Sequence, residues 1–145
     1  MRATHAATLV ALGFGFLAGG TVAHGQAPGT SADKNVTLTL HAVNHSGVTG
    51  TATLIPVGSK LRVVLILAKP VKGALPAYIR RGTCKSQPIT NKLRIRHFLN
   101  GVVGGRSDTL VSDTLKKLQQ GVFSINVYQQ ERPDLAIVCG EIPLT

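Results

Sequence analysis

The sequence predicts an all-β protein, an antiparallel β-sandwich of about seven to eight short strands with one short helical turn. Two observations carry this prediction. Apolar and polar residues alternate along much of the chain, which is typical of strands with one buried and one exposed face. Turn-forming residues recur about every 8 to 12 positions, as expected where short antiparallel strands are joined by tight turns.

The first three predicted strands cover residues 35–43, 48–55 and 61–68. Apolar residues alternate with threonine and other polar residues in the first two, and the third is more continuously apolar. Asparagine, serine, glycine and proline fill the two intervening turns, at 44–47 and 56–59. Because both turns are short, we expect these strands to pair as an antiparallel meander.

A loop at 70–76 leads to the next predicted strand, 77–81. In that strand Ile79 faces the core, whereas Tyr78 and Arg80 occupy the opposite side, because successive strand residues point to opposite faces. The connection 85–107 is long and basic. Its apolar residues Leu93, Ile95 and Phe98-Leu99 predict a short strand or an ordered loop there.

The last predicted elements are two strands, a helical turn and a final strand. The strands are expected at 109–112 and 123–128, and the final strand at 135–142. The helical turn covers 113–120, with Asp113 as its N-cap and Gly121 as its stop. In the strand at 123–128, Tyr128 lies opposite the side taken by the apolar residues.

The first 25 residues are typical of a cleaved secretory signal peptide. Met1-Arg2 is a short positive region, residues 6–18 are mostly apolar, and small residues follow, with plausible cleavage after Ala23, Gly25 or Ala27. A membrane anchor is the alternative, but spanning a bilayer takes about 20 apolar residues. We expect a periplasmic or secreted protein with a flexible lead-in at 26–34 and one domain at 35–145.

The chain has only two cysteines, Cys84 and Cys139. In an exported protein such a pair is expected to form a disulfide bond, because oxidising compartments preserve disulfides. Neither cysteine is therefore expected to act as a nucleophile. No Gly-x-Ser-x-Gly motif is present, and His41, His45 and His97 have no spacing that predicts a metal site.

The charge is strongly unbalanced, with 16 Lys and Arg against 6 Asp and Glu and a net charge of +10. Such a balance favours an anionic partner: an acidic lipid, a cell-wall polymer or an acidic protein. Export and the scarcity of aromatic residues make nucleic acid an unlikely partner. The alternative is that the charge only keeps the protein soluble. The basic residues cluster at Arg80, Arg81, Lys85, Lys92, Arg94 and Arg96.

Four short motifs in a fixed order resemble the copper/zinc superoxide dismutase-like sandwich, in particular its short exported bacterial branch of chordin-type (CHRD-like) domains. The motifs are Val36-Thr37-Leu38 with Gly50-Thr51-Ala52, Pro76-Ala77-x-Ile79-x-x-Gly82-Thr83-Cys84, Gly121-x-x-x-Ile125-Asn126-Val127 and Cys139-Gly140-x-Ile142. The resemblance covers nearly all of the predicted domain. It implies a Greek-key sandwich, and the two cysteines match the family's disulfide positions.

The same resemblance assigns the metal-binding positions to Tyr78, Arg80 and Tyr128, where the family has histidines. An arginine carries a permanent positive charge and has no lone pair for a metal, so the resemblance implies a scaffold that has lost its metal. No cofactor and no catalytic residue is expected. The candidate anion-binding residues are Tyr78, Arg80, Arg81, Arg94, Arg96 and Tyr128.

Two functions remain open from the sequence. The first is a non-catalytic exported module that binds an anionic ligand or envelope partner through this basic face, and the second is a divergent metalloenzyme of the dismutase type.

Metal content distinguishes these two functions. After growth with copper and zinc, we expect elemental analysis of the purified protein to find well below one metal ion per chain, because the three ligand positions lack imidazole. Stoichiometric copper together with dismutase activity would favour the metalloenzyme instead.

Overall fold

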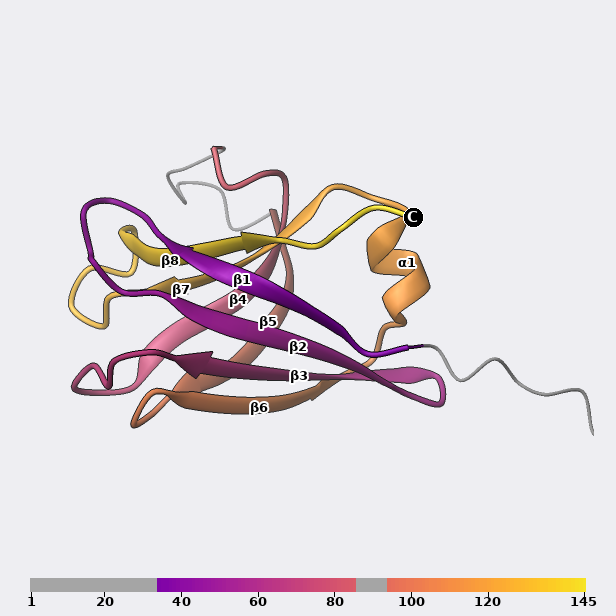
Figure 1. The fold of residues 1–145 in the computed structure, drawn as a ribbon, viewed down its shortest axis with the longest axis horizontal. Helices are drawn as coiled ribbons and strands as arrows, with labels where there is room; N and C mark the ends of the chain where they lie inside the picture. The colour runs from indigo at the N-terminus through magenta and orange to yellow at the C-terminus, as the bar shows by residue number, and fades with distance from the viewer. Residues whose placement is uncertain (1–33, 86–93) are drawn as a thin grey trace, which may run out of the picture. The chain divides into compact units, whose positions relative to one another are not determined.

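A computed structural model describes residues 34–85 and 94–145, and these residues form strands with one short helix (Figure 1). In chain order the elements are β1 (Val36–Ala42), β2 (Gly50–Val57), β3 (Lys60–Leu67), β4 (Leu75–Arg81), β5 (Ile95–Val102), β6 (Arg106–Val111), α1 (Leu115–Gln119), β7 (Phe123–Tyr128) and β8 (Ala136–Glu141). The predicted signal peptide, the lead-in up to residue 33, and residues Lys92 and Leu93 lie outside the described residues.

All described strand pairs are antiparallel, and their order in the sheet is β5-β4-β7-β8-β1-β2-β3-β6. The two end strands, β5 and β6, lie close to each other, so the sheet nearly closes on itself. These strands belong to a compact unit, Ser31–Thr145. The predicted all-β class and the predicted antiparallel pairing are confirmed.

Aliphatic side chains fill the space that the sheet encloses. Along β1 and β2 the apolar residues predicted from the alternation point inward and the threonines between them point outward, and the more continuously apolar β3 adds Leu61, Val63, Leu65 and Leu67 to the core. The core has few aromatic rings, so leucine, isoleucine and valine supply most of the buried apolar surface. Its fully buried members include Leu40, Leu54, Leu61, Leu65, Ile79, Ile125 and Val127.

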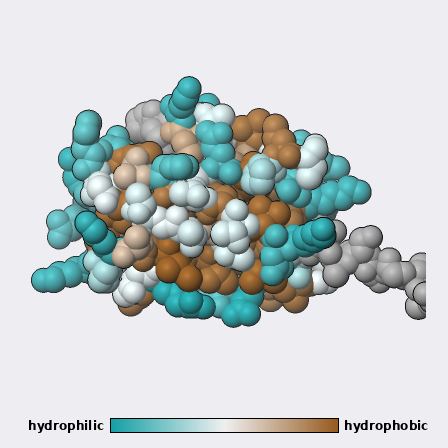
Figure 2. All heavy atoms as spheres, in the orientation of Figure 1, coloured by the Kyte–Doolittle hydropathy of each residue, from teal (hydrophilic) through white to brown (hydrophobic). Residues whose placement is uncertain are grey.

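The outer face of β1, β2 and β3 is weakly polar. Thr37 faces Thr53 across β1 and β2, and Val64 lies beside Thr53 on β3. Figure 2 views the molecule from the side of these strands and shows uncharged and apolar residues over the middle of the face, with hydrophilic residues toward its rim. The middle of this face is therefore less hydrophilic than its rim.

Side chains join β5 to β6 where the sheet nearly closes. The two strands leave a tight turn at Gly104 and Gly105, where Val103 and Arg106 exchange two backbone hydrogen bonds. Beyond this pair, Asn100 links the two strands. Its backbone N–H donates to the Thr109 hydroxyl at 2.8 Å, and its side-chain amide donates to the Asp108 carbonyl oxygen. The strands thus stay together without a regular backbone ladder.

The structure corrects two local predictions, the start of β4 and the N-cap of α1, and decides between a strand and an ordered loop for the region around Ile95 and Phe98. Strand β4 begins at Leu75, inside the predicted loop, and its pairing with β5 shifts register around Pro76, which has no N–H to donate. Residues 95–102 form a full eight-residue strand, β5. The N-cap of α1 is Thr114, whose hydroxyl accepts from the Lys117 N–H at 3.3 Å, and Asp113 is not the cap.

In the described part of the chain, no helix has the length and apolar character needed to cross a membrane.

Gly140 is required where β8 passes close to β1. A Cβ at this position would lie 2.7 Å from the Thr39 carbonyl oxygen and 2.5 Å from Leu38 Cδ1. A backbone oxygen cannot move aside as a flexible side chain can, so a methyl group here forces the two strands apart.

We therefore expect Gly140→Ala to lower the free energy of unfolding by about 1–3 kcal/mol, the usual cost of overpacking a dense core. Gly101→Ala is the matched control, because its Cβ would meet its nearest neighbour, the Leu75 carbonyl oxygen, at an ordinary 3.5 Å. Urea unfolding measures both. Equal midpoints for the parent and Gly140→Ala would show that β1 and β8 are not packed this closely.

Candidate anion-binding site

The candidate site lies on the outer face of β4, β7 and β8, the side that points away from the hydrophobic core. Strand register places its residues in two neighbouring rows. The first row contains Tyr78, Asn126 and Cys139, and the second contains Arg80, Ser124 and Glu141. Most of these side chains are polar, in contrast to the apolar side chains that face the core.

Arg80 is the central residue of this face, and it is buried, with only 3% of its surface exposed. Its Nη1 donates a hydrogen bond to the Tyr128 hydroxyl at 3.1 Å. Its Nε is also buried and has no hydrogen-bond partner. Beside it, the Asn126 side-chain amide donates to the Ser124 hydroxyl at 3.0 Å, and both residues are buried. The site thus combines a desolvated cation with several polar side chains.

The burial of Arg80 and Tyr128 corrects the expectation that they lie on an open face. The predicted side of the strand is right, since neither residue belongs to the hydrophobic core cluster. Both are nevertheless buried, and all six residues of β7 are buried on both of its faces. Alternation fixes the side of the sheet that a residue occupies, but it does not show whether other parts of the chain cover that side.

A comparison with Asp113 shows how unusual Arg80 is. These two are the buried charged residues of the described chain. Asp113 accepts hydrogen bonds from Arg96 Nε at 3.0 Å and from His97 Nε2 at 2.8 Å, so the Arg96 guanidinium matches its charge. Among the described residues, no carboxylate lies within ion-pair distance of Arg80. Burying an uncompensated charge costs several kcal/mol, so a counter-ion beside Arg80 would stabilise the folded state.

Tyr128, the partner of Arg80, belongs to a group of three neighbouring aromatic rings. The Tyr78 ring lies 5.5 Å from the Tyr128 ring, centroid to centroid, and 5.4 Å from the Phe98 ring in an edge-to-face arrangement. Phe98 is 69% exposed, Tyr78 is half-buried and Tyr128 is fully buried. Phe98, Tyr78 and Tyr128 therefore form an aromatic row that runs from solvent to Arg80.

The structure brings only part of the predicted basic cluster to this site. Arg81 points to the other side of β4, and its guanidinium lies 5.6 Å from the centre of the Phe123 ring, a cation–π distance. Arg96 pairs with Asp113. Arg94 is exposed just before β5. Tyr78, Arg80 and Tyr128 thus converge, whereas Arg81 and Arg96 are engaged elsewhere.

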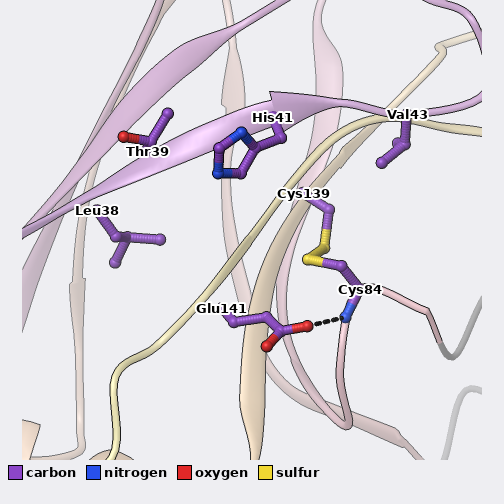
Figure 3. A pocket seen from close by; sticks show the side chains of 7 residues that line it. All are labelled: Leu38, Thr39, His41, Val43, Cys84, Cys139 and Glu141. Atoms are coloured by element: carbon purple, nitrogen blue, oxygen red, sulfur yellow. Dashed lines mark hydrogen bonds between the residues drawn. A yellow bond between two sulfur atoms is a disulfide. The ribbon is translucent and has the colours of Figure 1, made fainter.

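The predicted disulfide between Cys84 and Cys139 is present, with their Cα atoms 5.7 Å apart. It joins the segment after β4 to β8 and lies beside a pocket of about 380 Å³ that Figure 3 shows from close by. The His41 ring and the Glu141 carboxylate also line this pocket. Glu141 Oε1 accepts a hydrogen bond from the Cys84 backbone N–H at 2.9 Å, so the only acid in the Arg80 row is already engaged.

Sequence reasoning missed two features of this region. Alternation along 123–128 places Ser124 and Asn126 on the same side as Tyr128, but their place next to Arg80 follows from strand pairing that no local pattern reveals. Asp113 was taken for a helix cap, although it links β5 to the start of α1. In residues 34–85 and 94–145, no three His, Cys, Asp or Glu side chains gather in a way that could hold a metal ion.

Comparison with known proteins finds no match to a family model, a curated protein or a solved structure. The resemblance to the superoxide dismutase-like sandwich therefore stays a prediction, and the arguments about this site come from its geometry.

The surroundings of Asp113 predict how stability depends on pH. Burial disfavours the charged carboxylate and acts to raise its pKa. The hydrogen bonds from His97, the Thr114 N–H and Arg96 outweigh burial, so the pKa of Asp113 lies below its ordinary value of 3.8. A carboxyl with a lower pKa in the folded state adds stability that is complete above the unfolded-state pKa and is lost as the pH falls through the folded-state pKa.

We expect Asp113→Asn to lower the free energy of unfolding by about 1–3 kcal/mol at pH 7, because the neutral amide accepts weaker hydrogen bonds from Arg96, His97 and the Thr114 N–H than the carboxylate does. The difference from the parent should begin to shrink as the pH falls below about 4, where the carboxyl of the unfolded chain becomes protonated, and should be lost only below the lower pKa of the folded state. Asp134→Asn serves as control, since Asp134 is exposed and its pair with Arg132 is long, at 3.5 Å. A stability difference that stays constant down to pH 2 would contradict this account.

Proposed function

We propose that this protein is an exported, non-catalytic module that binds an anionic ligand or envelope partner at the site around Arg80. One observation carries the proposal: a buried guanidinium has no carboxylate partner in the described chain, and its Nε has no hydrogen-bond partner. Such a cation is costly to bury, and a bound anion removes that cost. The neighbouring Ser124 and Asn126 supply the polar surroundings that an anion needs.

The fold that we propose is a superoxide dismutase-like Greek-key sandwich. The strand order supports it, because hairpin-connected strands are interrupted by neighbours distant in sequence: β4 beside β7, β8 beside β1 and β3 beside β6. The meeting of Tyr78, Arg80 and Tyr128 on adjacent strands also supports it, since the resemblance assigns these positions to one metal site. A site that keeps this geometry and replaces imidazole with guanidinium suits an anion in place of a metal cation.

Export is the second part of the proposal. The two cysteines form a disulfide bond, and such bonds persist mainly in oxidising compartments such as the periplasm or the extracellular space. The net charge of +10 attracts acidic lipids, cell-wall polymers and acidic proteins to the protein over a longer range, whereas the enclosed Arg80 can contact only one anionic group.

Anion-dependent stability tests the proposal. At constant ionic strength, we expect phosphate or acetate to raise the melting temperature of the full-length chain, and neutral acetamide to leave it unchanged. A ligand that binds only the folded state at 100 times its Kd stabilises that state by about 2.7 kcal/mol. Arg80→Met keeps an unbranched side chain without the charge, so it should abolish the anion effect.

The matched control is Arg106→Gln, which removes the same charge from an exposed position on β6. It should respond to anions as the parent does. Without added anion, we expect the free energy of unfolding of Arg80→Met to be no more than about 1 kcal/mol below that of the parent. Removing an unpaired buried charge also removes the cost of taking that charge out of water. The proposal fails if both variants respond equally to anions, or if Arg80→Met alone unfolds the protein.

A further inference from the structure

Two other arginines of this chain show how its guanidinium groups meet carboxylates. Arg62 donates from Nε to Asp108 Oδ1 at 2.8 Å and from Nη2 to Asp108 Oδ2. Arg96 also approaches Asp113 with Nε and Nη2, each 3.0 Å from Oδ2. In both cases the side edge of the guanidinium, formed by Nε and Nη2, contacts the acid. This edge matches the two oxygens of a carboxylate.

Arg80 has this same edge without an acid. Its hydrogen bond to Tyr128 uses Nη1, the nitrogen on the other side of the guanidinium. Its buried Nε, one half of the side edge, has no partner. The hydrogen bond to Tyr128 therefore leaves unused the edge that Arg62 and Arg96 use for carboxylates, and a planar carboxylate fits this edge better than a spherical anion does.

The aromatic row indicates what the rest of the ligand is like. The described residues contain few aromatic rings, and Phe98, Tyr78 and Tyr128 lie next to one another on adjacent strands. Phe98 keeps 69% of its surface exposed at the outer end of the row. Aromatic rings pack favourably against other flat apolar rings. A ligand whose carboxylate meets Arg80 would thus have a flat apolar body beside Tyr78 and Phe98.

We propose that the ligand is an aryl carboxylate: its carboxylate binds the Nε and Nη2 edge of Arg80, and its ring packs on Tyr78 and Phe98. This inference rests on the proposed anion-binding function and narrows it to one chemical class. Arg80 supplies the charge recognition, and the exposed Phe98 supplies the preference for a ring.

Calorimetric titration of the full-length chain with three small probes at constant ionic strength tests the inference. Benzoate has both the carboxylate and the ring, acetate has only the carboxylate, and benzamide has the ring without the charge. We expect benzoate to bind roughly two- to tenfold more tightly than acetate, the range expected for one aromatic contact. Benzamide should give no measurable binding.

Three variants separate the two parts of the site. Phe98→Ala alters an exposed side chain, so it should fold normally and bring the affinity for benzoate down to that for acetate, without changing the acetate affinity. Leu144→Ala is its control, an apolar residue of similar exposure outside the aromatic row. Arg80→Lys keeps the positive charge but lacks the two-pronged edge, so it should weaken both carboxylates at least tenfold, as loss of a charged hydrogen bond does.

The outcomes separate the inference from the proposed function. If acetate binds as tightly as benzoate and both need Arg80, the aryl preference is overturned and the anion site stands. If benzamide binds as tightly as benzoate, the ring and not the carboxylate is recognised, and the inference fails. If neither carboxylate binds, and phosphate has no effect either, both proposals fall together.

Discussion

The disulfide between Cys84 and Cys139 is the constraint on which the candidate site depends. It ties the chain that leaves β4 to β8, and β7 runs between these two strands. Closing a loop of 55 residues stabilises the folded state by roughly 4 kcal/mol on the chain-entropy estimate. The same bond places the Cys84 N–H against Glu141, so the acid that shares a row with Arg80 binds a backbone amide. The scaffold thereby keeps the guanidinium and its only acid in that row apart.

The scarcity of acids gives the buried arginine its significance. With 6 Asp and Glu for 16 Lys and Arg, most cations of this chain have no acid to pair with. For an exposed side chain this costs little, because water solvates the charge. Arg62 and Arg96 obtain two of the few acids, while Arg80 is buried without one. A buried charge without a carboxylate is the kind of local inconsistency that proteins carry at functional sites.

The sequence predicts the strands far better than it predicts the site. Alternating residues locate β1, β2, β3 and β7 well, because each has an apolar side that must face the core. Alternation does not locate β5 in the same way, since only Leu99 and Val102 of its eight residues are buried. Its position follows from pairing with β4, which is a contact between distant parts of the chain.

A local sequence pattern also cannot predict whether the second side of a sheet is buried. Tyr78, Arg80 and Tyr128 were correctly placed on one side of their strands, and the disulfide was correctly predicted from the cysteine pair. Local alternation could not show that this side is covered, because coverage depends on how distant segments fold over it. The separation of Arg81 and Arg96 from Arg80 has the same origin: each finds a nearer partner, the Phe123 ring or the Asp113 carboxylate.

The seam between β5 and β6 has a consequence for the motions of this protein. Backbone hydrogen bonds hold the other neighbouring strands together, whereas Asn100, Ser107 and Thr109 bridge this seam largely through their side chains. Side-chain links exchange with water more readily than a continuous ladder does, so opening of the fold should begin here. Because β5 also carries Phe98, fluctuations of this seam would move the outer end of the aromatic row.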